Sequence, residues 1–376
     1  MKILFITHYS SMYGANKSLC SLLLDLRSTY KLTPLVLLPS HGAICEFLEK
    51  HQIEYIVSPF YWWVNSERGV YKCLLNIRKQ IVNYYRINAI LAMLEDYNIG
   101  AVYSNSIVIN LGYFISSRLN CPHIWHFRES MDSYNFKFSL GKRFAAFFFI
   151  YSAQKYILIS DYLMRYYSPL LPHDRVIRIY NGLSLNCSVP SFTKMTNMNI
   201  AVVGVISSQK NQMDILRASL LLRHRGYANF TLHFIGTAQS SYLTQIKTFL
   251  KENNLDSFCQ FHGHVSNVHA LLDSMHLGIV TSRDEAFGRV SIEYMLHSMP
   301  VIASNSGANP ELIKMGENGF LYELFNSTEL ANYIEYFLNN SESMRKMGIQ
   351  ARKFAEANFS QEQNSRNVYE VICSVL

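Results

Sequence analysis

The sequence predicts an α/β protein made of two units, each a parallel sheet covered by helices on both faces. Short apolar runs alternate with stretches of helical periodicity along almost the whole chain of 376 residues. A continuously apolar strand is typical of a parallel sheet that is buried on both sides. A polar segment near residue 190 interrupts this alternation before a second series of strands begins, which predicts two domains joined by a linker.

The first series predicts an N-terminal Rossmann-like domain over residues 1–185. The first run, residues 2–7, is too short for a signal peptide and is followed by polar turn residues, so it is interpreted as a buried strand. Helical periodicity covers residues 16–27 and 107–119. The other strand-like runs are residues 34–38, 54–57, 101–104, 123–127, 156–160 and 176–180.

Residues 186–198 are rich in Ser, Thr, Asn and Pro, which is the composition of a linker. A second Rossmann-like domain is predicted over residues 199–357, and residues 358–376 are predicted to form a helix that packs back on the first domain. The strand-like runs of the second domain are residues 199–205, 230–236, 259–264, 277–281 and 301–304.

Composition limits the classes of partner. Hydrophobic residues make up 49% and charged residues 16% of the chain, which argues against disorder. The net charge of +7 favours anionic partners such as phosphorylated small molecules or anionic lipid head groups. No nucleic-acid-binding motif is present, so nucleic acid is not an expected partner. Seven cysteines without a C-x-x-C pair indicate a reducing, cytoplasmic location rather than a disulfide framework.

The segment from Glu285 to Glu293 carries the clearest chemical signal. It follows the apolar run 277–281, and ligands of open parallel sheets bind beyond the carboxyl ends of the strands. A helix opening at Gly288 places Glu293 roughly 7–8 Å further along. Two carboxylates at this spacing can accept hydrogen bonds from two pairs of hydroxyls, with a phosphate at the helix start between them. The alternative is a pair of acids that only favours the start of a helix.

This segment resembles the donor-site motif of retaining glycosyltransferases of the GT-B fold, family 4, also described as glycosyl transferases group 1. The matching features are Glu-x7-Glu, Phe287-Gly288 and the later Pro300-Val301-Ile302-Ala303. Further matches occur in the family's order, at Tyr13 to Asn16, Trp125 to Glu129, Asn181-Gly182-Leu183, Gly204 with Lys210, Ser306 to Glu311, and Asn318-Gly319-Phe320. The resemblance spans nearly the whole chain and implies two domains facing across a cleft.

The resemblance also implies site residues. Lys210, Glu285 and His126 are the expected catalytic residues, with the Lys210 ammonium neutralising the leaving diphosphate. The alternatives are a solvated lysine and, for His126, a histidine of the core. The residues expected to bind the donor are Gly14, Gly204, Lys210, Phe287, Gly288, Arg289, Glu293, Gly307, Ala308 and Glu311. The residues expected to bind the acceptor are Asn16, Arg128 and Glu129.

One position departs from the family pattern. The family often has Arg directly after the glycine that matches Gly204, whereas this chain has Val205. Arg289 is the hypothesised replacement for that positive charge. No D-x-D occurs, and His262, His264 and His269 lack a convincing ligand set, so neither a metal nor any other cofactor is expected beside the nucleotide sugar.

Two basic, aromatic segments are predicted to form amphipathic helices of the first domain. Between Arg68 and Arg86 basic residues and no acidic ones are interleaved with Leu, Ile and Tyr, and Lys142 and Arg143 precede a Phe-rich run. Such helices adsorb to anionic membranes, although the aromatic stripe can instead belong to the core. The prediction is peripheral contact with the cytoplasmic face of the inner membrane.

The predicted function is sugar transfer, with retention, from a nucleotide sugar to a glycan acceptor, lipid-linked in bacterial polysaccharide or surface-glycan biosynthesis. A nucleotide-sugar epimerase and an inverting transferase on the same fold are the enzymatic alternatives. The non-enzymatic alternative is an inactive sugar-nucleotide-binding protein, which only Val205 supports. The absence of G-x-G-x-x-G after the first strand argues against hydride transfer.

Overall fold

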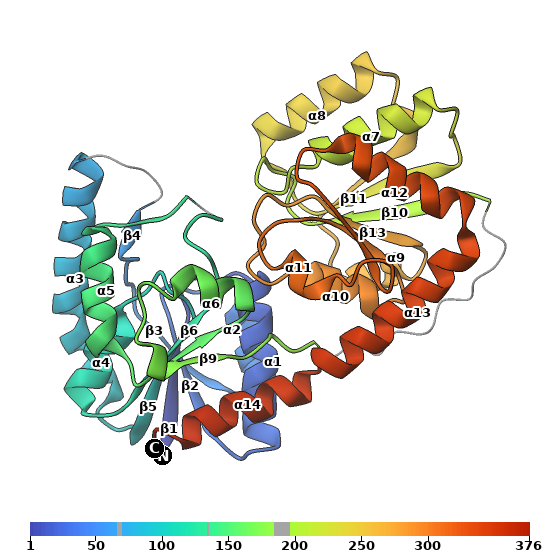
Figure 1. Cartoon of the computed structure of the whole chain (residues 1–376). Coiled ribbons are helices and arrows are strands. Elements are labelled where there is room, and N and C mark those ends of the chain that lie inside the picture. The colour runs from blue at the N-terminus through green and yellow to red at the C-terminus, as the bar shows by residue number, and fades with distance from the viewer. Residues whose placement is uncertain (66–69, 134, 184–195) are drawn as a thin grey trace. The chain divides into compact units, whose positions relative to one another are not determined.

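The computed structural model describes residues 1–65, 70–133, 135–183 and 196–376 (Figure 1). They belong to two compact units, which we call unit 1 (Met1–Gly182 with Gln361–Leu376) and unit 2 (Leu183–Ser360). Both units are α/β with a parallel sheet, so the predicted fold class is confirmed. Most of the predicted linker, residues 186–198, lies outside the described residues.

Unit 1 contains a sheet in the order β3-β2-β1-β5-β6-β8-β9, with every neighbouring pair parallel. The order runs outward in both directions from the β1–β5 pair, which is the switch point beside which open sheets bind ligands. The strands are β1 (Lys2–Ile6), β2 (Thr33–Leu38), β3 (Glu54–Val57), β5 (Ile99–Ser104), β6 (His123–Phe127), β8 (Lys155–Leu158) and β9 (Val176–Arg178).

The last helix of the chain, α14 (Gln361–Cys373), belongs to unit 1 and packs against α1 (Gly14–Ser28). Gln361 Nε2 donates to Asp25 Oδ2 at 3.0 Å, and the Tyr30 and Tyr369 rings stack at 4.3 Å. The apolar face of α14 is fully buried in the core of this unit. The other described helices of unit 1 are α2 (Ala43–Lys50), α3 (Val70–Leu94), α4 (Leu111–Leu119), α5 (Gly141–Ser152), α6 (Asp161–Tyr167) and η1 (His173–Arg175).

A short antiparallel ribbon of β4 (Val64–Asn65) and β7 (Lys137–Phe138) precedes α3 and α5 in the chain. The Cys73 thiol donates to Ser139 O at 3.2 Å, which places the start of α3 next to the segment before α5. None of the described helices has both the length and the apolar character that crossing a bilayer requires.

Unit 2 contains a sheet in the order β12-β11-β10-β13-β14-β15, again parallel throughout. The strands are β10 (Met198–Val203), β11 (Phe230–Ile235), β12 (Cys259–Gly263), β13 (Leu277–Val280), β14 (Val301–Ser304) and β15 (Gly319–Tyr322). Its described helices are α7 (Met213–His224), α8 (Ser240–Glu252), η2 (Asp256–Phe258), α9 (Val268–Leu272), α10 (Arg289–Leu296), α11 (Asn309–Leu312), α12 (Ser327–Asn339) and α13 (Ser341–Asn358).

Close packing fixes α10 against this sheet. The Tyr294 ring covers Gly278 so closely that a Cβ at residue 278 would lie 2.1 Å from the ring. The Tyr294 hydroxyl accepts a hydrogen bond from Val203 N at 2.7 Å, and its side chain is fully buried. Because α10 cannot shift without breaking these contacts, the loop that leads into it is held at the carboxyl edge of β13.

Candidate functional site

The predicted donor residues of unit 2 come together at the carboxyl edge of its sheet. Gly204 follows β10, Glu285 follows β13, and Gly307 follows β14, and these three strands are neighbours in the order β10-β13-β14. Lys210 lies in the turn after Gly204. Residues far apart in sequence therefore meet because each ends its strand at the same edge.

Lys210 and Glu285 form an ion pair across this edge, with 2.7 Å between Lys210 Nζ and Glu285 Oε2. The lysine side chain is 34% exposed and the glutamate 19%. The backbone of Lys210 is fixed, since its carbonyl accepts a hydrogen bond from Thr281 Oγ1 at 2.7 Å. A half-exposed ammonium on a rigid turn is suited to binding an anionic ligand without rearrangement of the main chain.

The second ion pair lies on α10, where Arg289 Nε is 2.9 Å from Glu293 Oε1. Gly288 precedes the helix with φ +90° and ψ +42°, a left-handed conformation that favours glycine. Phe287 is buried, with its ring 5.9 Å from that of Phe359. Its side chain therefore anchors the loop, and any contact of residue 287 with a donor falls to its backbone.

The loop after β14 packs against the backbone of Glu285 and holds it in place. Gly307 has φ +56°, and a Cβ there would lie 2.4 Å from Glu285 O. Ala308 is fully buried, and its N–H donates to the same carbonyl at 2.7 Å. In this structure the Ala308 N–H positions Glu285, and the assignment of Ala308 to the donor phosphates stays a prediction. Glu311 is half-buried in the short helix α11.

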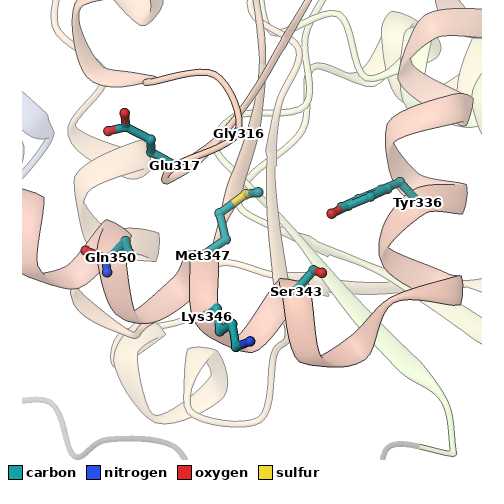
Figure 2. Close-up of a pocket in the computed structure, with 7 residues that line it drawn as sticks. All are labelled: Gly316, Glu317, Tyr336, Ser343, Lys346, Met347 and Gln350. Atoms are coloured by element: carbon teal, nitrogen blue, oxygen red, sulfur yellow. The ribbon is translucent and has the colours of Figure 1, made fainter.

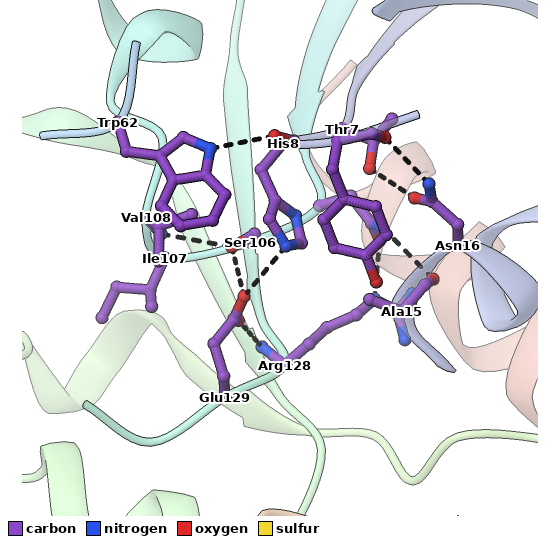
Figure 3. Close-up of polar contacts among 12 residues, drawn as sticks. Thr7, His8, Ala15, Asn16, Trp62, Ser106, Ile107, Val108, Arg128 and Glu129 are labelled. Atoms are coloured by element: carbon purple, nitrogen blue, oxygen red, sulfur yellow. Dashed lines mark hydrogen bonds and ion pairs between the residues drawn. The ribbon is translucent and has the colours of Figure 1, made fainter. Parts of the chain in front are cut away.

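In unit 1 the corresponding edge holds a buried polar cluster around Glu129 (Figure 3). Glu129 accepts hydrogen bonds from the Ser106 hydroxyl and, at 3.0 Å, from the Arg128 N–H. His8 Nε2 is 3.8 Å from Glu129 Oε1. Burial raises the pKa of Glu129, whereas burial and the nearby Arg128 charge lower the pKa of His8 to about 3. The imidazole is therefore neutral near pH 7.

Arg128 and Asn16, both predicted to bind the acceptor, make internal contacts. Arg128 donates to Asn105 Oδ1 at 2.6 Å and to Asn181 Oδ1. Asn16 is fully buried, accepts from Thr7 Oγ1 at 2.5 Å, and donates to the carbonyls of Tyr9 and Ser11 (Figure 3). The side chain of Asn16 thus holds the loop between β1 and α1, and its assignment to the acceptor stays a prediction.

His126 and Gly14 are placed very differently. His126 lies within β6, has no exposed surface, and pairs through Nδ1 with the Tyr103 hydroxyl. Burial, followed by the Arg128 charge, holds the pKa of His126 well below its usual value. These surroundings match the alternative reading of His126 as a histidine of the core. Gly14 is exposed at the first residue of α1, and no atom lies within 4 Å of the place where its Cβ would be.

Sequence reasoning missed His8, Asn105 and Ser106 of the unit 1 cluster, and it named Asn181 only within a matching segment, without a role. His8 comes shortly after the end of β1, Asn105 and Ser106 follow β5, and Asn181 comes shortly after β9. A search for polar residues just past every apolar run would have found them, since the carboxyl ends of parallel strands share one edge.

The histidines of unit 2 form pairs within the unit. His233 Nδ1 is 3.0 Å from His262 Nε2, and His269 Nδ1 is 3.2 Å from His297 Nε2. The other ring nitrogen of His297 faces Asp273 Oδ1 at 3.0 Å. Among the described residues, no group of three or more His, Cys, Asp or Glu side chains is arranged to hold a metal ion.

A hollow of about 500 Å³ lies elsewhere on unit 2 (Figure 2). Tyr336 of α12 and Lys346 and Met347 of α13 line it together with Gly316 and Glu317. None of the residues predicted to bind donor or acceptor contributes to this hollow. The charged edge around Lys210, rather than this open depression, has the groups that a charged substrate needs.

Sequence comparison matches residues 190–354 to a family described as "Glycosyl transferases group 1". A glycosyltransferase of Methanocaldococcus jannaschii is 29% identical over 266 residues, which cover 69% of this chain and 71% of that protein. The Staphylococcus aureus capsular polysaccharide biosynthesis glycosyltransferase CapM is 27% identical over 180 residues, covering 46% of this chain and 45% of CapM.

Solved structures share the fold along the entire chain. The Anabaena protein HepE, crystallised with UDP, superposes with a TM-score of 0.81 at 22% identity, and the match covers 100% of both chains. The lipopolysaccharide outer core galactosyltransferase WaaB superposes with a TM-score of 0.75 at 17% identity, also over 100% of both chains. These likenesses confirm the predicted GT-B class of fold.

Proposed function

We propose that this chain, whose residues 190–354 match the family described as "Glycosyl transferases group 1", moves a sugar from a nucleotide-sugar donor to a hydroxyl of a glycan acceptor. The observation that carries the proposal is the Lys210–Glu285 pair, 2.7 Å apart at the carboxyl edge of unit 2 and flanked by Glu293. An ammonium and two carboxylates there match a ligand with a diphosphate between two sets of hydroxyls.

In the proposed reaction, the bond from the anomeric carbon to the diphosphate oxygen breaks as the acceptor oxygen bonds to the same face of the sugar. Because the new bond forms on the face that the leaving group departs from, the configuration at the anomeric carbon is retained. The acceptor proton passes to the departing phosphate oxygen. Lys210 neutralises the charge that develops on the leaving group, and no metal takes part. Glu285 and Glu293 accept hydrogen bonds from donor hydroxyls. His126 is left out of this scheme because its side chain is fully buried.

The identity of the donor nucleotide is tested by a thermal-shift panel. The panel starts with uridine nucleotides, because HepE has been crystallised with UDP and with UDP-glucose. Purified full-length chain is heated with UDP, GDP, ADP, CDP and dTDP and with their sugar forms. A ligand that binds only the native state raises the free energy of unfolding by about 2.7 kcal/mol at a hundredfold excess over Kd. Stabilisation by one nucleotide and release of that nucleotide from its sugar are expected. Failure of every nucleotide to stabilise the chain would contradict the proposal.

The stereochemical part of the proposal has its own test. NMR of the product, or of the sugar released by slow hydrolysis of the donor, reports the anomeric configuration directly. Retention of the donor configuration supports the scheme above. Inversion would replace it with direct displacement by an acceptor that needs a protein base.

We further propose that the acceptor is lipid-linked and that unit 1 adsorbs to the cytoplasmic face of the inner membrane. The helices α3 and α5 both expose large apolar side chains to solvent. On α3 these are Leu74, Ile77, Ile81, Tyr84, Tyr85 and Met93, and on α5 they are Phe144, Phe147, Ile150 and Tyr151. The aromatic stripe is divided, because Phe149 is buried in the core while Phe147 is 61% exposed.

Charge on the same helices favours an anionic bilayer as the partner. Arg78 and Lys79 on α3 and Lys142 and Arg143 on α5 are exposed, and α3 contains no acidic residue. Part of the predicted basic segment, including Arg68, lies outside the described residues. Each basic side chain near an anionic surface contributes about 1 kcal/mol of attraction. Apolar contact and charge therefore act together on one face.

The membrane proposal is tested by flotation with vesicles of phosphatidylglycerol and phosphatidylethanolamine at low salt. Wild type is expected to float, and the double variant Lys142→Glu with Arg143→Glu is expected to float less. Lys247 and Lys251 on α8 are also exposed, so their double reversal is the matched control and should behave as wild type. Absence of wild-type binding at low salt would end the membrane proposal and leave sugar transfer untouched.

A further inference from the structure

The donor edge of unit 2 holds two cation–carboxylate pairs, and three of their four residues lie within Glu285–Glu293. Lys210 pairs with Glu285 at 2.7 Å, and Arg289 pairs with Glu293 at 2.9 Å. All four side chains are partly exposed, from 13% for Glu293 to 34% for Lys210. The charges of these four groups cancel. A nucleoside diphosphate carries several negative charges, so cations must turn toward it if it is to bind at this edge.

The position of Arg289 is unfavourable for a purely structural ion pair. It is the first residue of α10, where the helix dipole repels cations, and the first turn of α10 contains no acidic residue. The order Arg before Glu at i and i+4 is also the weaker arrangement of such a pair. Such a loss of helix stability is expected where a residue is kept for binding a ligand and not for stabilising the helix.

A second pair in the same unit provides the contrast. Arg352 Nε is 2.8 Å from Glu356 Oε1 on α13, with the same i and i+4 spacing. Arg352 lies in the interior of α13 (Ser341–Asn358), away from its first turn, so the dipole at the helix start does not repel it. The two arginines thus make similar contacts, but only Arg289 lies at a helix start beside Lys210 and Glu285.

A buried hydroxyl in the first turn of α10 adds an independent observation. Ser291 is fully buried, and its Oγ has no hydrogen-bond partner among the described residues. It lies 3.6 Å from the place where a Cβ on Gly288 would be, at the entrance to the helix. Buried hydroxyls are normally paired, so this unsatisfied group at the helix start is one that a water molecule beside a bound phosphate would satisfy.

We infer that Arg289 is a second binding residue for the donor diphosphate, and that Lys210 and Arg289 exchange their carboxylate partners for phosphate oxygens when the donor binds. The exchange frees Glu285 and Glu293 to accept hydrogen bonds from donor hydroxyls. A guanidinium can bind two phosphate oxygens at once, which an ammonium cannot do with the same geometry. The inference rests on the proposed function, since it assigns a further contact to the same donor.

The test is isothermal titration of the full-length chain with UDP and with UMP, in wild type and in variants of Arg289. If another diphosphate of the thermal-shift panel binds instead, that diphosphate and its monophosphate replace the uridine pair. Because one contact to a charged phosphate is lost, Arg289→Ala is expected to weaken UDP binding about tenfold to a hundredfold. UMP binding should weaken about threefold or less, and Arg289→Lys should keep part of the UDP preference.

Arg352→Ala is the matched control, because it removes an equivalent Arg–Glu pair from another helix of unit 2. It is expected to bind both nucleotides as wild type does. Equal weakening of UDP and UMP by Arg289→Ala, or an unchanged preference for UDP, overturns the inference while sugar transfer stands. Failure of wild type to bind any diphosphate overturns the proposed function itself. Should Arg289→Ala fail to fold, Arg289→Lys and Arg289→Gln provide the same comparison of UDP with UMP.

Discussion

The carboxyl edges of the two sheets carry similar residue types in different physical states. In unit 2 Glu285 and Glu293 are 19% and 13% exposed and each pairs with a cation, as Glu285 pairs with Lys210. In unit 1 Glu129 is buried, its pKa is raised by burial, and its partners are a hydroxyl, a backbone N–H and a neutral His8. The difference teaches that the position of an acid after a strand does not decide its role. Exposure and partner do.

The largest expected effect is on catalysis in unit 2. Replacing Lys210 with Ala removes the charge that faces the leaving diphosphate, so kcat for release of the nucleotide from its sugar should fall about a hundredfold to a thousandfold. Lys247→Ala on α8 is the control and should leave the rate unchanged. A Lys210→Ala enzyme with the wild-type rate would contradict the assignment of catalysis to the carboxyl edge of unit 2.

The next effect is on stability through unit 1. Glu129→Ala leaves the Ser106 hydroxyl and the Arg128 N–H without their acceptor in the interior. The free energy of unfolding should fall by about 2–4 kcal/mol, measured by urea denaturation. Nucleotide affinity of the folded chain should not change. A variant as stable as wild type with a raised KM for acceptor would instead place Glu129 in the acceptor site.

Acid should destabilise both units through their buried histidines. Burial lowers the pKa of His123 in unit 1 to about 4, and burial followed by the charge of His262 lowers the pKa of His233 in unit 2 to about 4. Since these pKa values lie below the unfolded value of 6.5, the stabilisation is complete above pH 6.5 and is lost as pH falls toward 4. Each such group contributes a slope of about 1.4 kcal/mol per pH unit in that window.

Thermal unfolding between pH 7.5 and 4.5 checks this expectation. His123→Gln should flatten the pH dependence at the cost of stability at neutral pH, because the Ser104 and Ser152 partners of His123 are only partly replaced. A melting temperature that rises on acidification from pH 6.5 to 5 would show that these histidines are protonated in the folded chain.

The smallest expected effect is a partial recovery of UDP affinity when a new arginine replaces the charge of Arg289 at the carboxyl edge of unit 2. Val205 is 40% exposed beside Gly204, so an arginine fits there without repacking. In the Arg289→Ala background, Val205→Arg should recover about threefold of the lost UDP affinity, as expected for a cation that is more solvated than Arg289. Titration calorimetry measures the recovery. Further loss of affinity would show that the donor diphosphate does not reach residue 205.

Much of the fold followed from local sequence patterns. The runs at residues 123–127, 277–281 and 301–304 predicted β6, β13 and β14 closely, because buried parallel strands are apolar throughout. The meeting of Lys210 with Glu285 was expected only from the family resemblance, because local patterns do not report the strand order that makes β10 and β13 neighbours. The ribbon of β4 and β7 did not follow from local patterns either, because two-residue strands leave no periodic signal.

The remaining differences arise from contacts between distant residues. Ala308 looked available to a phosphate, but its N–H is used by Glu285 O, and no local pattern reports such a pairing between loops. Asn16 looked like a ligand-binding residue at the start of a helix, yet it caps the backbone of its own loop. Tertiary packing decides which polar groups already have hydrogen-bond partners. The sequence predicts only that these groups lie at the ends of strands.

A crystal structure of the full-length chain with UDP tests the central claim most directly. The account predicts the diphosphate at the carboxyl edge of β10 and β13, with Lys210 Nζ and the Arg289 guanidinium about 3 Å from phosphate oxygens. Glu285 and Glu293 would then have lost the ion pairs described above. A diphosphate bound elsewhere, or bound while both ion pairs persist unchanged, would contradict the account.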